Sequence, residues 1–201
     1  MRKAKKIIKD FNGDTHKTVL FLSYKAENWN TMDNIYKKYC QEKDIKVIVQ
    51  CVPYYYKNID GTFEKYIDGG MYPEYVTITP IEDYNYVNEN PDVIVFQYPY
   101  DNYNSAGTTD PVFYSYNLAS HTQKLIYIPY FRTDEIDEND MRAYTNMDAY
   151  VTMPGVVYAD KVIVQSEEIR KLYIEKLTDF FGEESEDEWE DKIEAEDIGG
   201  I

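Results

Sequence analysis

The sequence is poor in cysteine and histidine, which build disulfide frameworks and most zinc centres. Its 201 residues include two cysteines, Cys40 and Cys51, and two histidines, His16 and His121. The cysteines lie among apolar neighbours without CxxC spacing, and we interpret them as buried free thiols of a reducing compartment. Each histidine precedes a predicted strand, where a surface or capping role suits it better than catalysis. We therefore expect neither a metal ion nor another cofactor.

Several signature segments are also missing. No GxGxxG follows the first predicted strand, and no GxxxxGK[ST] occurs, which argues against the usual dinucleotide and P-loop phosphate sites. The GxSxG elbow of serine hydrolases is absent. No run approaches the roughly 18 apolar residues of a membrane span, and no apolar segment of signal-peptide length follows the N-terminus. These absences predict a cytoplasmic protein.

Positive charge is scarce, since the formal net charge is −16. A nucleic-acid partner is not expected, because such proteins need a basic face to displace phosphate counterions. Residues 1–16 form a basic amphipathic segment that suits either peripheral contact with the inner face of an anionic membrane or a solvated first helix. Residues 183–197 carry ten acids and one lysine. Residues 183–201 are therefore interpreted as an acidic tail or linker remnant, unless 186–194 form a helix that packs through Trp189 and Ile193.

Short apolar runs dominate the rest of the chain. Continuous runs, rather than alternating ones, are typical of parallel strands covered on both faces. Helical periodicity starts near Trp29 and again after Ser166, a predicted N-cap, with Gly182 closing the second helix. We predict an α/β fold: one Rossmann-like, doubly wound, mainly parallel sheet of about six strands in a single domain over 17–182. The expected strands are 18–23, 45–52, 92–96, 124–129, 161–165 and, more weakly, 75–79.

Tyrosine is the abundant residue, at 22 of 201. Its ring and hydroxyl suit sites that stack on and hydrogen-bond to sugars or polyols. Ligands of open parallel sheets bind beyond the carboxyl ends of the strands, and tyrosines follow several of the predicted strands. The edge of the sheet at the carboxyl ends of its strands would thus form a cleft for a polar ligand. The same tyrosines could instead merely fill the edges of the sheet. The candidate ligand-binding residues are Tyr24, Lys25, Tyr54, Lys57, Tyr98, Tyr100, Asn104 and Arg132, with Lys25 or Arg132 meeting a phosphate.

Two carboxylates near this rim are candidate catalytic bases. Asp101 and Asp110 both belong to the polar segment that follows the strand 92–96. Either side chain could instead cap a turn, and for Asp110, which precedes a proline, capping is the better interpretation.

Several segments resemble bacterial proteins of the CDP-glycerol glycerophosphotransferase-like family. They are "LFLSYKAENWNTMDNIYKKY", "PYDNYN", "DPVFYSYNL", "KLIYIPYF" and "PGVVYADKVIVQSEEIRKLYIEKL", and the resemblance covers roughly Thr18 to Phe181. It implies a GT-B architecture, in which two Rossmann-like halves face each other across a cleft. This chain would be the amino-terminal, acceptor-side half. The donor would be CDP-glycerol or a related nucleotide-linked alcohol, and the product a teichoic-acid-like or other cell-surface polymer.

Two departures from the family pattern limit this expectation. Asp110 stands where the family tends to place a histidine base, and the sequence stops where a linker to the donor-binding half would begin. The resemblance therefore implies weak binding of a polyol, sugar or phosphorylated acceptor, and no turnover without a second half. The alternatives are a stand-alone binding or regulatory protein for a small polar ligand, and a structural remnant that forms homodimers.

Overall fold

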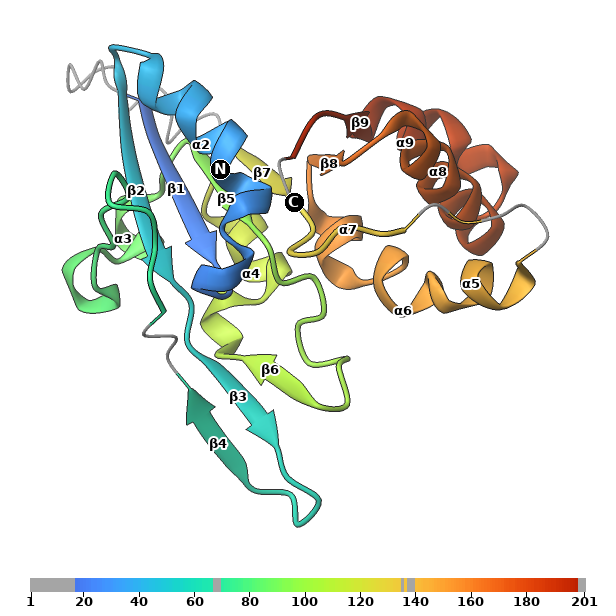
Figure 1. Cartoon of the computed structure of the whole chain (residues 1–201), viewed down its shortest axis with the longest axis horizontal. Coiled ribbons are helices and arrows are strands. Elements are labelled where there is room, and N and C mark those ends of the chain that lie inside the picture. The colour runs from blue at the N-terminus through green and yellow to red at the C-terminus, as the bar shows by residue number, and fades with distance from the viewer. Residues whose placement is uncertain (1–16, 67–69, 135, 137–139, 199–201) are drawn as a thin grey trace.

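The computed structural model describes residues 17–66, 70–134, 136 and 140–198 (Figure 1). The basic segment 1–16 and His16 lie outside the described residues. The main sheet has six parallel strands in the order β2-β1-β5-β7-β8-β9, which confirms the predicted Rossmann-like α/β fold. The strands are β1 (Lys17–Ser23), β2 (Ile45–Cys51), β5 (Val93–Phe96), β7 (Lys124–Tyr127), β8 (Lys161–Val164) and β9 (Ile193–Ala195).

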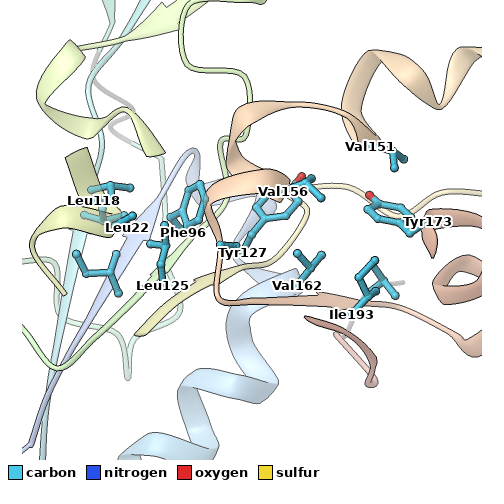
Figure 2. Packing of buried hydrophobic residues seen from close by; sticks show 14 of the residues in the cluster. Leu22, Phe96, Leu118, Leu125, Tyr127, Val151, Val156, Val162, Tyr173 and Ile193 are labelled. Carbon is cyan, nitrogen blue, oxygen red and sulfur yellow. The ribbon is translucent and has the colours of Figure 1, made fainter. Parts of the chain in front are cut away.

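Both faces of this sheet are buried, because successive strand residues point to opposite sides. On one side Val19 and Phe21 pack against Trp29 and Met32, in and just before α2. On the other side strand residues meet the helices α4, α6, α7, α8 and α9 (Figure 2). The helices are α2 (Asn30–Gln41), α3 (Tyr86–Glu89), α4 (Ser115–Ser120), α5 (Met141–Asn146), α6 (Asp148–Val151), α7 (Pro154–Tyr158), α8 (Glu167–Phe181) and α9 (Glu186–Lys192).

The predicted ends of α8 are confirmed. The Ser166 hydroxyl accepts a hydrogen bond from the Ile169 backbone N–H at 3.3 Å, as an N-cap does. The helix ends at Gly182, whose φ of +106° lies in a region that favours glycine. Helix α2 begins at Asn30 with Trp29 in the cap position, and no side chain caps it.

The sixth strand differs from the one predicted. In 75–79, Ile78 makes a single bridge to Val49, and Pro80 follows directly, so this weaker candidate does not extend the sheet. The sixth strand is instead β9, which pairs with β8 at the other edge.

Strand β9 comes from the acidic segment, so most of that segment belongs to the fold. The sequence allows either a solvated acidic tail or a helix that packs through Trp189 and Ile193, and in the structure both residues are buried. Arg170 also donates to the backbone carbonyls of Ile193 and Glu190. The acidic side chains of α9 are exposed, while its one apolar residue, Trp189, is buried in the hydrophobic core. The domain therefore reaches at least Ile198, rather than ending at Gly182.

A second, antiparallel sheet lies beyond the carboxyl ends of β1 and β2 (Figure 1). It consists of β3 (Tyr54–Lys57), β4 (Phe63–Tyr66) and β6 (Gly107–Thr109) in the order β4-β3-β6. The sequence predicts 54–57 only as the exit of a strand, because the pairing partners of this segment are far away along the chain.

The two cysteines differ in their burial. Neither cysteine forms a disulfide, and Cys51 is buried as predicted, but Cys40 is exposed because it lies on the outer side of α2. Within the described residues, no helix has the length and apolar character needed to cross a membrane.

Candidate functional site

Five tyrosines meet at the carboxyl ends of the parallel strands. Tyr24 follows β1, Tyr98 and Tyr100 follow β5, Tyr130 follows β7, and Tyr54 begins β3. The Tyr24 ring is central: its centroid lies 4.9 Å from that of Tyr54, 5.0 Å from Tyr98 and 5.1 Å from Tyr130. The Tyr100 ring lies 5.2 Å from Tyr98. We call these five residues the tyrosine cluster. The tyrosines that follow the parallel strands therefore lie together at one edge of the sheet, as predicted.

The β3–β4 hairpin extends the tyrosine cluster towards solvent. Alternate residues of a strand share a face, so Tyr56 lies on the same side of β3 as Tyr54, and their centroids are 5.4 Å apart. Tyr66 pairs with Tyr54 across the hairpin, with centroids 5.0 Å apart. Tyr56 and Tyr66 are exposed, so the cluster continues as an accessible aromatic surface.

Lys25 places a positive charge against these rings. Its Nζ lies 5.3 Å from the Tyr24 centroid and 5.4 Å from the Tyr54 centroid, within the range of cation–π attraction. The Glu27 carboxylate lies 3.6 Å away, and this side chain is largely exposed. An ion pair with so exposed a partner is weak, so an anionic ligand can compete for Lys25.

The tyrosine hydroxyls are neutral donors and acceptors. Burial, the main cause, raises the pKa of Tyr24, Tyr54, Tyr98 and Tyr100 above the ordinary tyrosine value. Neighbouring hydroxyls interact weakly: the Tyr100 and Tyr130 oxygens are 3.3 Å apart. Tyr24, Tyr54, Tyr98 and Tyr100 are therefore equipped to stack and hydrogen-bond as neutral phenols.

A buried glutamine holds Tyr24 in place. Gln97 lies at the switch point of the sheet, where β5 and β2 flank β1 on opposite sides. Its Oε1 accepts from the Tyr24 backbone N–H at 3.0 Å, and its Nε2 donates to the Asn28 carbonyl and the Thr31 hydroxyl, both at 2.9 Å. Gln97 thus fixes the segment after β1 against β5.

Asp101 is buried, and both of its carboxylate oxygens are engaged in hydrogen bonds. It is buried at 3% exposure, with a φ of +50°, which Asp tolerates better than most residues. Its two carboxylate oxygens accept from the Ser115 backbone N–H and hydroxyl, both at 2.8 Å. Burial raises the pKa of Asp101 to about 6, against the opposing effect of the Ser115 hydrogen bonds. These contacts favour a role in anchoring the loop to the start of α4.

Asp110 lies in a different place. Its carboxylate accepts from the Val112 backbone N–H at 3.1 Å and caps the short 3₁₀ turn Pro111–Phe113, as the capping interpretation expects. It lines a separate cavity of about 220 Å³ together with Tyr55, whose side chain alternates with those of Tyr54 and Tyr56. The structure therefore does not bring the two candidate bases together in one site.

The remaining predicted residues lie in or near the loop 97–106, which joins β5 to β6. Lys57 donates from Nζ to the carbonyl oxygens of Asn102 and Asn104, at 2.8 and 2.7 Å. The Asn104 side chain accepts from the Ala106 backbone N–H at 2.8 Å. Arg132 is exposed, two residues beyond Tyr130. Lys57 and Asn104 thus hold the loop conformation, and Lys25 places a positive charge against the cluster.

Sequence reasoning missed Tyr130, Tyr56, Tyr66 and Gln97. For Tyr130 a signal existed, because the segment Pro129-Tyr130-Phe131 follows a predicted strand. Tyr56 and Tyr66 reach the cluster through antiparallel pairing, which no local pattern reveals. Gln97 belongs to the loop after β5, and its burial depends on the neighbouring strand.

Replacing Gly155 with alanine should destabilise the protein by about 1–3 kcal/mol, because the site is already close-packed. The Gly155 backbone N–H donates to the Pro99 carbonyl at 2.8 Å, and a Cβ here would lie 2.4 Å from the Pro99 Cα. Pro99 separates Tyr98 from Tyr100, so the cluster should shift too. Urea unfolding and near-ultraviolet circular dichroism measure the two effects. The exposed Ser105→Ala is the control, and equal stability of the two variants would contradict the close contact.

Comparisons with protein-family models, curated proteins and solved structures find no match for this chain. Among the described residues, no group of His, Cys, Asp or Glu is arranged to hold a metal ion. The functional argument therefore rests on the tyrosine cluster and Lys25.

Proposed function

We propose that the tyrosine cluster binds a hydroxyl-rich ligand, a polyol or sugar that carries a phosphate. The observation that supports this best is the position of Tyr24, which contacts three other tyrosine rings while Lys25 lies against its own. Aromatic faces pack against the C–H groups of such ligands, and phenolic hydroxyls bond their oxygens. Lys25 supplies the charge that a phosphate needs.

Within this proposal, the chain acts as the acceptor-side domain of a glycerophosphotransferase-like GT-B enzyme of cell-surface polymer synthesis. Phosphoryl transfer depends mainly on positioning the donor and neutralising its phosphates. The described residues around the cluster supply one nearby lysine, and Asp101 is engaged with Ser115. Turnover would therefore require a second Rossmann-like body that holds the nucleotide-linked donor.

A stand-alone binding or regulatory protein is the second candidate. The observation in its favour is that Tyr24, its ring partners and Lys25 all come from one domain. The two functions differ in one respect: the transferase role requires a donor-binding partner, whereas ligand binding alone does not.

Binding of glycerol 3-phosphate, glycerol and inorganic phosphate, followed by calorimetry or NMR titration, tests the proposal. We expect Lys25→Met to weaken both phosphate-containing probes about tenfold, the usual effect of losing a charged hydrogen bond, and to spare glycerol. Tyr24→Ala should weaken glycerol and glycerol 3-phosphate about three- to tenfold, because it removes the stacking ring.

Lys171→Met is the matched control, because this lysine is exposed on α8. Its affinities should equal those of the wild type. The proposal fails if the wild-type protein binds none of the three probes, or if all variants bind them equally.

A further inference from the structure

A second cavity lies on the face of β3 opposite the tyrosine cluster. Its volume is about 220 Å³. Successive residues of a strand point to opposite faces, so Tyr55 lines this cavity whereas the Tyr54 and Tyr56 rings meet on the other face. Across the hairpin Lys65 pairs with Tyr55, and it lines the cavity too. The cavity is therefore separate from the tyrosine cluster.

Aromatic residues form much of the wall of this cavity. They are Tyr55, Tyr84, Tyr86 and Phe113. A dry cavity of about 150 Å³ can bind benzene, so the volume here leaves room for a benzene-sized ring and a few further atoms. The wall thus suits a small ligand with an aromatic or other apolar body.

A buried amide in the wall has an unused acceptor. Gln50 is 1% exposed, and its Nε2 donates to the Pro80 and Tyr84 carbonyl oxygens, both at 3.0 Å, which fixes the orientation of the amide. No described residue donates to the Gln50 Oε1. This oxygen is not sealed off, unlike the Tyr127 hydroxyl, and the cavity is the space that Gln50 borders. Amide oxygens inside proteins are rarely left unpaired, so a donor on a ligand would be stabilised here.

Two opposite charges line the same cavity, those of Asp110 and Lys65. The Asp110 Oδ1 accepts from the Val112 backbone N–H, and its Oδ2 has no donor among the described residues. Burial and, after it, the Asp110 charge raise the pKa of Tyr86 above the ordinary tyrosine value, so this carboxylate lies close to the cavity wall. Lys65 is exposed, and no carboxylate in the described part of the chain pairs with it.

These groups differ in what they can bind. The Asp110 carboxylate and the Gln50 Oε1 are acceptors, and an ammonium group offers three donors. Aromatic faces attract the same cation. Lys65 offers only donors and lies nearer to solvent than Gln50, so it suits an anionic group at the outer end of the ligand.

We propose that this cavity binds an amino acid with an apolar side chain, for which L-phenylalanine is the probe. Its ammonium group would donate to Asp110 and Gln50, its carboxylate would meet Lys65, and its ring would pack against the aromatic wall. The chain thereby has a second small-molecule site that does not depend on the tyrosine cluster. Asp110 has a binding role there.

Three probes separate the contributions of the two charges. L-phenylalanine carries both charged groups, phenethylamine lacks the carboxylate, and hydrocinnamate lacks the ammonium group. NMR titration that follows the side-chain amides of Gln50 and Asn85, which both line the cavity, measures affinity and location together. The wild type should bind L-phenylalanine most tightly and hydrocinnamate most weakly.

Two substitutions remove one charge each. Asp110→Asn keeps the oxygen that caps the 3₁₀ turn, and it should weaken L-phenylalanine and phenethylamine about tenfold without weakening hydrocinnamate. Lys65→Met should weaken the two probes that carry a carboxylate about two- to fivefold, because this lysine is exposed, and it should spare phenethylamine.

Asp83→Asn is the matched control. Asp83 is exposed between the cavity residues Ile81 and Tyr84 but does not line the cavity, so this variant should bind all three probes like the wild type. The inference is overturned if the wild type does not bind L-phenylalanine at the Gln50 and Asn85 amides, or if Asp110→Asn binds it as tightly as Asp83→Asn does. Glycerol 3-phosphate binding should be the same in all three variants, so either failure leaves the proposed function standing.

Discussion

Trp189→Ala should lower the free energy of unfolding by about 3–5 kcal/mol, the range seen when a large buried aromatic side chain is truncated. Trp189 is 3% exposed; its ring centroid lies 5.3 Å from that of Phe181, and its Nε1 donates to the Ser185 hydroxyl at 2.9 Å. Its ring packs α9 against Phe181 at the end of α8, and α9 leads directly into β9. The substitution should therefore also loosen the edge of the main sheet.

Urea unfolding followed by circular dichroism measures the loss of stability, and hydrogen exchange at Val162 to Val164 reports on the pairing of β8 with β9. Glu190→Ala is the control. The Glu190 side chain is exposed, and its backbone carbonyl still accepts from Arg170, so the change should stay within about 0.5 kcal/mol. If Trp189→Ala is as stable as this control, the acidic segment is not part of the folded domain.

Asp101 should make the protein less stable as the pH rises from about 4 to about 6. Burial raises the pKa of Asp101 from 3.8 to about 6 in the folded state. Below the unfolded pKa both states are protonated and the contribution is complete. Between the two values only the folded state keeps the proton, so stability falls, and above the folded pKa the contribution is lost. The loss is on the order of 2–3 kcal/mol.

Asp101→Asn isolates this effect. An amide can accept from the Ser115 backbone N–H, donate to its hydroxyl and tolerate the positive φ, but it does not titrate. We expect the variant to gain about 2–3 kcal/mol relative to the wild type between pH 4 and pH 7. Asp83→Asn, an exposed position, controls for the lost charge. Parallel stability profiles of Asp101→Asn and the wild type would show that Asp101 does not hold its proton in the folded protein.

The architecture of the main sheet follows from local patterns. Continuous apolar runs such as Val19 to Leu22 must be buried on both faces of a sheet. Helices that alternate with such strands cover both faces of a parallel sheet, so the alternation predicts one. The caps Ser166 and Gly182 act within one helical turn, so the sequence shows them directly. The strand β9 is different: its three residues are too short for a recognisable run, and the charges around them suggest solvent.

The site shows the same division. Its tyrosines are visible as residues that follow apolar runs, and parallel strands bring such residues to one edge regardless of distant detail. The direction of each side chain is not visible in this way. Asp101 turns towards Ser115 and Asp110 caps its own turn, because each finds unpaired backbone N–H groups close by. Those partners exist only once α4 and the 3₁₀ turn before it are formed.

The amino-acid sequence by itself determines the sheet, its two covering layers and the gathering of tyrosines at one edge, since these depend on burial and on patterns within a few residues. The tertiary structure alone decides that residues 193–195 complete the sheet and that Tyr56 and Tyr66 join the cluster. The reason is physical. Pairing between distant strands and the volume left between packed side chains depend on residues far apart along the chain.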